Sequence, residues 1–158
     1  MNEQDKVFMR RAIELAQDGV DAGDGGPFGA VVVRDGAIIG EGCNRVTSTN
    51  DPTAHAEIVA IREACRNLNS FQLEGCTIYT SCEPCPMCLG AIYWARPVKM
   101  YFACHREDAA RVGFDDDFIY DEIALPIEER HIASINFLRE EGLKVFENWA
   151  NKADKTEY

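Results

Sequence analysis

The hydrophobic positions along the chain follow two periodicities, and their order predicts an α/β fold. Residues 7–20 carry apolar side chains at helical spacing, and the glycine-rich residues 23–27 break that pattern. The valine-rich residues 29–34 and the apolar residues 37–43 are predicted strands, joined by a turn at Asp35-Gly36. The first part of the chain is therefore predicted to be a helix followed by an antiparallel hairpin.

A second helix is expected after the polar loop that follows the hairpin. Pro52 suits the first turn of a helix, with Asp51 as its cap. This helix would end near Asn67 and bury one apolar face, which includes Ile58 and Ile61. Its length and its single apolar face are typical of a helix that covers a sheet.

Shorter helices and strands alternate along the rest of the chain. Alternation of this kind predicts one mixed sheet covered by helices, with the later strands parallel. The chain shows no internal repeat and no linker, so a single domain over residues 1–158 is expected. The predicted elements are strands at 76–80, 98–103 and 131–138, helices at 87–95, 107–112 and 143–150, and a turn at 126–130.

Composition and charge narrow the classes of function. The 158 residues are 46% hydrophobic and carry a formal net charge of −11. Proteins that hold a long polyanion usually present a basic patch, so no nucleic-acid partner is expected and a small, nearly neutral substrate is favoured. No apolar run is long enough for a membrane helix, and the acidic start is unlike a secretory signal. The cytoplasm is therefore the expected location, with no membrane partner.

Two short segments carry the chemistry. His55-Ala56-Glu57 and Pro84-Cys85-Pro86-Met87-Cys88 together match the H-x-E…P-C-x-x-C signature of zinc deaminases. His55, Cys85 and Cys88 supply three ligands for one zinc ion per chain, and a catalytic zinc site keeps its fourth position open for water. A C-x-x-C step at a helix start places both thiolates on one face, near the positive end of the helix dipole.

Glu57 is the candidate acid–base group. Two thiolates cancel the charge of the ion, so the water needs a nearby base, and Glu57 follows the histidine ligand by two residues. Glutamate could also be a fourth ligand, although a closed shell would leave no position for water. Two other interpretations remain open at this point: a redox pair at Cys85 and Cys88, and a metal cluster that includes Cys82.

The sequence resembles the cytidine-deaminase-like superfamily, and within it the small bacterial guanine deaminases. The matching segments are residues 51–57, 80–92, 25–30 and 113–116, and the terminal Tyr158. The resemblance implies a three-layer α/β fold with a central mixed five-stranded sheet flanked by helices. It also implies hydrolytic deamination of guanine to xanthine and ammonia.

The same resemblance assigns roles around the substrate. It implies that Asn44 holds the edge of the base, that Phe28 contacts its face, and that Asp116 recognises the base or relays a proton. Tyr158 would close the pocket, often from the partner subunit of a homodimer through an exchanged segment of about residues 130–158. Ala56 and Trp94 complete the predicted substrate contacts. Which of the aspartates at 115, 116 and 117 faces the site stays open.

Several rival functions remain. Within the same chemistry, the substrate could be guanosine, cytosine or a tRNA adenosine. A binding module stabilised by zinc but without catalysis is a second class, against which the retained Glu57 argues. A redox protein is a third class, and it predicts reversible oxidation of Cys85 and Cys88 without tightly held zinc.

Overall fold

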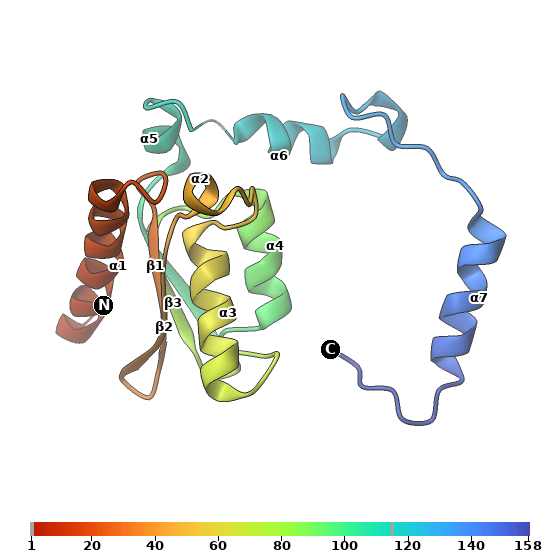
Figure 1. Ribbon diagram of the computed structural model, residues 1–158, viewed down its shortest axis with the longest axis horizontal. Coiled ribbons are helices and arrows are strands. Elements are labelled where there is room, and N and C mark those ends of the chain that lie inside the picture. The colour runs from red at the N-terminus through yellow and green to blue at the C-terminus, as the bar shows by residue number, and fades with distance from the viewer. Residues whose placement is uncertain (1, 115) are drawn as a thin grey trace. The chain divides into compact units, whose positions relative to one another are not determined.

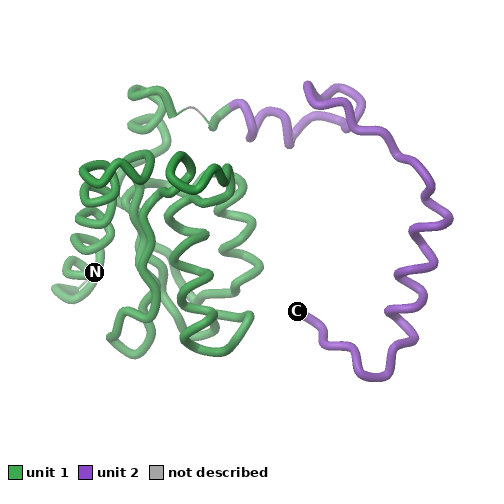
Figure 2. The backbone as a smooth tube through the Cα atoms, in the orientation of Figure 1, with its two compact units in different colours: residues 1–117 green, residues 118–158 purple. Residues whose placement is uncertain are grey.

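The computed structural model describes residues 2–114 and 116–158, so the predicted role of Asp115 lies outside the described residues. The chain divides into two compact units, residues 1–117 and residues 118–158 (Figure 2). The two units are described separately below. Within the described residues, no helix is long and apolar enough to cross a membrane.

The first unit is built on a four-stranded mixed sheet with the strand order β2-β1-β3-β4. The central strand β1 is antiparallel to both of its neighbours, whereas β3 and β4 run parallel. Asp35 and Gly36, both with positive φ, form the tight turn of the hairpin. The strands are β1 (Gly29–Arg34), β2 (Ala37–Cys43), β3 (Thr77–Cys82) and β4 (Lys99–Cys104).

Helices cover both faces of this sheet (Figure 1). Helix α1 (Glu3–Ala22) packs on one face, where Phe8 and Ala12 meet Val31, Val33 and Tyr79. Helices α3 (Ala56–Leu68) and α4 (Pro86–Ala95) pack on the other face, against side chains that alternate with the first set. This alternation follows from the two-residue period of a strand, and it gives the unit a core on each side of its sheet.

Helix α3 lies unusually close to strand β2. A Cβ atom at Gly40 would clash with the carbonyl oxygen of Ala60, and one at Gly42 would clash with that of Ala56. Both glycines therefore serve as notches in which the backbone of the helix sits. Helix α3 begins at the candidate metal ligand, so this packing also sets the distance between the site and the sheet.

The remaining elements are short. Helix α2 (Val46–Thr49) falls in the segment predicted to be a loop, and helix α5 (Arg106–Ala110) follows β4. The second unit contains most of α6 (Asp117–Ala124), a 3₁₀ turn at Ile127–Glu129 and α7 (Arg139–Ala150). None of its residues is buried, so the second unit has no core of its own.

The predicted mixed sheet flanked by helices is confirmed, but besides α2 the structure differs from the prediction in two places. The sheet has four strands and not five, because residues 131–138 have no regular structure. A strand needs a neighbour for its backbone hydrogen bonds, and the second unit contains no strand to pair with it. Helix α3 begins at Ala56 and not near Pro52, because the Asp51 carboxylate accepts hydrogen bonds from Thr53 and forms a turn there.

Candidate active site

The predicted site residues come together at one edge of the sheet, where strands β2, β3 and β4 end. Strand β1 begins where β2 and β3 end, since Gly29 pairs with Cys43 and Ala30 pairs with Thr80. The parallel pair of Cys82 with Cys104 places the end of β4 at the same edge. The carboxyl end of parallel strands is the usual place for a ligand site in such sheets.

Three side chains form a group that fits zinc. The Nδ1 atom of His55 lies 3.6 Å from Sγ of Cys85 and 3.5 Å from Sγ of Cys88. Ideal tetrahedral zinc with ordinary bond lengths would separate a nitrogen and a sulfur ligand by about 3.6 Å. Both nitrogen–sulfur distances therefore match those expected between two ligands of one tetrahedral zinc ion. The ligand atoms of all three residues lie within 4.8 Å of one another.

The ligands are held by helix starts. His55 is the N-cap residue of α3, and Cys85 is the N-cap residue of α4, where Pro86 takes the first helical position. The hydrogen bond from Cys88 and the contact with His55 lower the pKa of Cys85 to about 4. The Cys88 pKa is raised, first by its hydrogen bond to Cys85, so Cys85 is the thiolate of the pair. A bound cation would favour loss of the second proton as well.

Glu57 lies in the first turn of α3 and is buried, with 7% of its surface exposed. Burial raises the pKa of its carboxyl group above the usual range, because the charged form loses its hydration. A carboxyl group with a raised pKa is protonated more readily, which suits a group that both accepts and returns protons. Its burial beside the ligands and its presence in the cavity wall fit the predicted acid–base role.

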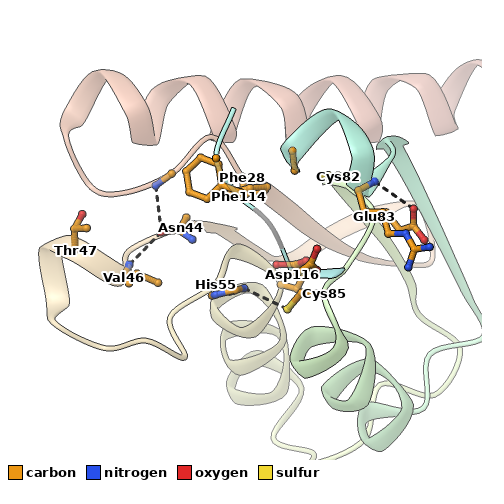
Figure 3. A pocket seen from close by; sticks show the side chains of 15 residues that line it. Phe28, Asn44, Val46, Thr47, His55, Cys82, Glu83, Cys85, Phe114 and Asp116 are labelled. Carbon is orange, nitrogen blue, oxygen red and sulfur yellow. Dashed lines mark hydrogen bonds between the residues drawn. The ribbon is translucent and has the colours of Figure 1, made fainter. Parts of the chain in front are cut away.

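A cavity of 390 Å³ opens beside these residues. Figure 3 shows His55 and Cys85 at one side of it and the aromatic side chains of Phe28 and Phe114 at another. The two rings meet edge to face, with 5.0 Å between their centroids. Most of the predicted site residues therefore line one cavity, namely Phe28, Asn44, His55, Glu57, Cys85 and Asp116.

Asp116 lines the cavity, and burial raises the pKa of its carboxyl group. Asp117 instead starts helix α6 and pairs with Arg106 at 3.3 Å. Of the two described aspartates in this run, Asp116 is therefore the one beside the candidate ligands.

The structure does not bring the other predicted residues into the cavity wall. Cys88, the third candidate ligand, is fully buried behind the wall, and Ala56, the first residue of α3, is fully buried in the core. Trp94, on α4, is 63% exposed and lines a different depression with Tyr93 and Arg96. Tyr158 belongs to the second unit and is 70% exposed. Substrate contact by Ala56, Trp94 and Tyr158 stays a prediction.

Sequence reasoning proposed no substrate contact for several residues of the cavity wall. Phe114 was part of a matching segment without being proposed as a contact, although an aromatic residue next to a predicted site aspartate was a usable signal. Cys82 ends strand β3, and the others come from loops and short helices whose positions no periodicity reveals. The full set is Gly26, Val46, Thr47, Cys82, Glu83, Arg106, Ala109 and Gly113.

The alternative metal cluster finds no support. The thiol of Cys82 donates a hydrogen bond to the carbonyl oxygen of His105 at 3.5 Å. Among the described residues, the metal-type group at this point contains His55, Cys85 and Cys88, and Cys82 is not part of it. All seven cysteines are free thiols.

Comparison with known proteins agrees with this geometry. The family model of the cytidine and deoxycytidylate deaminase zinc-binding region matches residues 2–104. The guanine deaminase of Bacillus subtilis (strain 168) is 59% identical over 153 residues, which are 97% of this chain and 98% of that protein. A tRNA-specific adenosine deaminase of Aquifex aeolicus is 44% identical over 98 residues, or 62% of this chain and 64% of that protein.

A solved structure agrees as well. The crystal structure of guanine deaminase from Bacillus subtilis superposes with a TM-score of 0.95 at 58% identity, and covers 100% of this chain and 99% of that one. The zinc-type ligand group and its neighbouring buried carboxyl group lie within the segment that the family model matches. The chain therefore belongs to the cytidine and deoxycytidylate deaminase family of zinc-binding enzymes.

Proposed function

We propose that this enzyme hydrolyses guanine to xanthine and ammonia. The observation that carries the proposal is one cavity that combines a zinc-type ligand group, a buried carboxyl group at Glu57 and an aromatic wall. The near full-length similarity to a guanine deaminase supports guanine over the other bases. The net charge of −11 speaks against a tRNA substrate, because it offers little attraction to a polyanion.

The cavity suits a flat ring. Its volume of 390 Å³ falls within the range of small-molecule sites, and its lining is mainly apolar with a few polar groups. The edge-to-face pair of Phe28 and Phe114 offers aromatic surface to a base. Asn44 adds a polar group to the cavity wall beside the two rings.

The chemistry follows from the positions of the chain's own groups. Zinc held by His55, Cys85 and Cys88 would lower the pKa of a water molecule and make it a nucleophile. Glu57 takes a proton from the attacking water and delivers protons to a ring nitrogen next to C2 and to the leaving amine. The C2–N bond breaks, ammonia leaves, and the water oxygen becomes the new carbonyl of xanthine.

The test is a direct assay of ammonia release. Zinc-loaded protein is incubated with guanine, guanosine, cytosine and adenine, and with tRNA in a separate reaction. Guanine is expected to give stoichiometric ammonia and xanthine, with slower or no reaction of the others. Ammonia from cytosine alone would overturn the choice of base, and stoichiometric zinc with no ammonia from any substrate would favour a binding module.

We also propose that the chain acts as a homodimer with an exchanged C-terminal segment. Residues 118–158 contain no buried residue, yet they expose large apolar side chains such as Ile132, Phe137 and Phe146. A segment of this composition is stable only when its apolar surface is covered. Packing against a second copy would cover it, and Tyr158 would then reach the partner's pocket, as the family resemblance implies.

Two measurements test the exchange. Light scattering is expected to give twice the monomer mass, and a monomer at micromolar concentration would overturn the proposal. Mixing an inactive Glu57→Gln chain with an inactive Tyr158→Ala chain should restore part of the activity if each site uses one residue from each copy.

The reduced state of all seven cysteines, two of them metal ligands, fits a reducing compartment such as the cytoplasm.

A further inference from the structure

Cys82 and Cys104 lie side by side at the ends of two neighbouring strands. They are directly paired in the register of the parallel strands β3 and β4. The backbone N–H of Glu83 donates to the carbonyl oxygen of Cys104 at 2.8 Å, so the pairing holds to the last residue of both strands. Neighbouring strands lie about 4.8 Å apart, and paired side chains point to the same face of the sheet. Because the Cα atoms of a disulfide lie about 4.4 to 6.8 Å apart, the backbone places these two thiols where they can be joined.

The two thiols differ in their access to solvent. Cys104 is exposed on the edge strand β4. Cys82 is 8% exposed and lines the cavity that contains Glu57 (Figure 3). Burial first, and then the nearby charge of Cys104, raise the pKa of Cys82 to about 11. Cys82 is therefore a protonated thiol at neutral pH, and Cys104 is the thiol of the pair that a dissolved oxidant reaches first.

We infer that hydrogen peroxide joins Cys82 and Cys104 in a reversible disulfide, and that this bond lowers turnover in the neighbouring cavity. The Cys104 thiolate first attacks one peroxide oxygen, so that an S–O bond forms and the O–O bond breaks. The hydroxide that leaves takes up the proton lost by this thiol and becomes water. The sulfur of Cys82 then attacks the sulfenic acid, the S–O bond breaks, and the second hydroxide takes the proton of Cys82. Two thiols are thus oxidised to one disulfide while one peroxide is reduced to two water molecules.

The disulfide acts on the catalytic cavity through a short piece of backbone. Cys82 is the last residue of β3, and the candidate ligand Cys85 follows three positions later. The Cys82 thiol now donates to the carbonyl oxygen of His105 at 3.5 Å, and a bond to Cys104 removes that proton and moves a side chain of the cavity wall. A misplacement of about 1 Å can lower a rate about 10²-fold, so a shift in this turn lowers turnover without touching the substrate. Disulfides of cytosolic proteins are usually transient and redox-sensing, which suits a bond of this kind.

The experiment treats the zinc-loaded protein with a small molar excess of hydrogen peroxide. The cross-link is detected by mass spectrometry of peptides after the remaining thiols are alkylated. Bound zinc and ammonia release from guanine are measured on the same sample, before and after a dithiol reductant is added. Cys104→Ala removes one partner and should keep the activity of the parent, because Cys104 lies outside the cavity wall. Cys65→Ala is the matched control, since it removes another partly buried thiol and leaves the pair intact.

Peroxide is expected to give the cross-link between Cys82 and Cys104 with zinc retained, and to lower turnover about tenfold or more until the reductant restores it. Cys65→Ala should respond as the parent does, and Cys104→Ala should keep its turnover throughout. Absence of the cross-link, a cross-link with unchanged turnover, or equal inactivation of Cys104→Ala would overturn the inference. The inference uses the proposed function only for the activity readout. No ammonia from the reduced protein would refute that function alone, and the cross-link, measured without substrate, would still decide for or against the disulfide.

Discussion

Replacing Glu57 with glutamine tests the proposed acid–base group most directly. The two side chains have the same shape, but the amide neither accepts nor returns a proton. Proton transfer by one positioned group contributes about 10²- to 10⁴-fold to a rate. Glu57 is 7% exposed and would serve both the attacking water and the leaving amine, so a loss in kcat of about 10³-fold, or about 4 kcal/mol, is expected.

The assay compares steady-state ammonia release with zinc content and guanine binding in the same preparation. Zinc should stay stoichiometric, because the ligand group does not include Glu57. Guanine should still bind, because the cavity keeps its volume and its aromatic wall. Glu41→Gln is a matched control, since this residue lies on β2 outside the cavity wall.

Asp116 is the group that could complicate the result. It is the other cavity carboxyl group whose pKa is raised by burial. If it shared the proton transfers, Glu57→Gln would lose less than tenfold and Asp116→Asn would lose a similar amount. Undiminished turnover by zinc-loaded Glu57→Gln protein would refute the assignment of Glu57.

Three further outcomes are expected. Cys85→Ser should weaken zinc binding by at least about 100-fold in a chelator competition, since a hydroxyl group is a far poorer ligand than a thiolate; an unchanged affinity would contradict the ligand assignment. Arg11 binds both carboxylate oxygens of Glu41 at 2.8 and 2.9 Å and lowers its pKa, so the stability gained is present above the unfolded pKa and is lost as pH falls through the folded one. Because the pair is one-third exposed, Glu41→Gln should cost about 1 kcal/mol in urea unfolding at pH 7 and progressively less as the pH is lowered, and a loss that does not change with pH would refute this. Ile78→Ala, at a fully buried position of β3, should lower the unfolding free energy by about 3 kcal/mol, and a loss below about 1 kcal/mol would show that the core collapses around it.

The sequence was most informative where one periodicity governed a whole element. The helix at the N-terminus, the hairpin and the two helices on the other sheet face were all predicted, because burial on a sheet demands their patterns. The metal ligands were predicted for a different reason, since zinc chemistry restricts residue type and spacing. The hydrophobic pattern of residues 131–138 is typical of a strand. A strand also needs a neighbouring strand to pair with, and the pattern of one segment cannot reveal whether that neighbour exists.

The cavity wall was predicted least well. Val46 and Gly26 contribute through backbone N–H groups that donate to Oδ1 of Asn44, and backbone groups carry no signature in the side-chain sequence. Phe114 and Arg106 come from loops and short helices around the end of β4, where tertiary contacts and not periodicity decide the position. The orientation of the Asn44 amide could be read only once its two donors were placed.

The active site depends on Gly40 and Gly42, the two glycines against which the backbone of α3 packs. Any added side chain at Gly40 or Gly42 would lift this helix off the sheet, and His55 and Glu57 would move with its first turn. A displacement of a few tenths of an ångström would strain the metal geometry and misalign proton transfer together. Residues that never approach the substrate would then govern turnover, and a search for activity determinants confined to the pocket would overlook them.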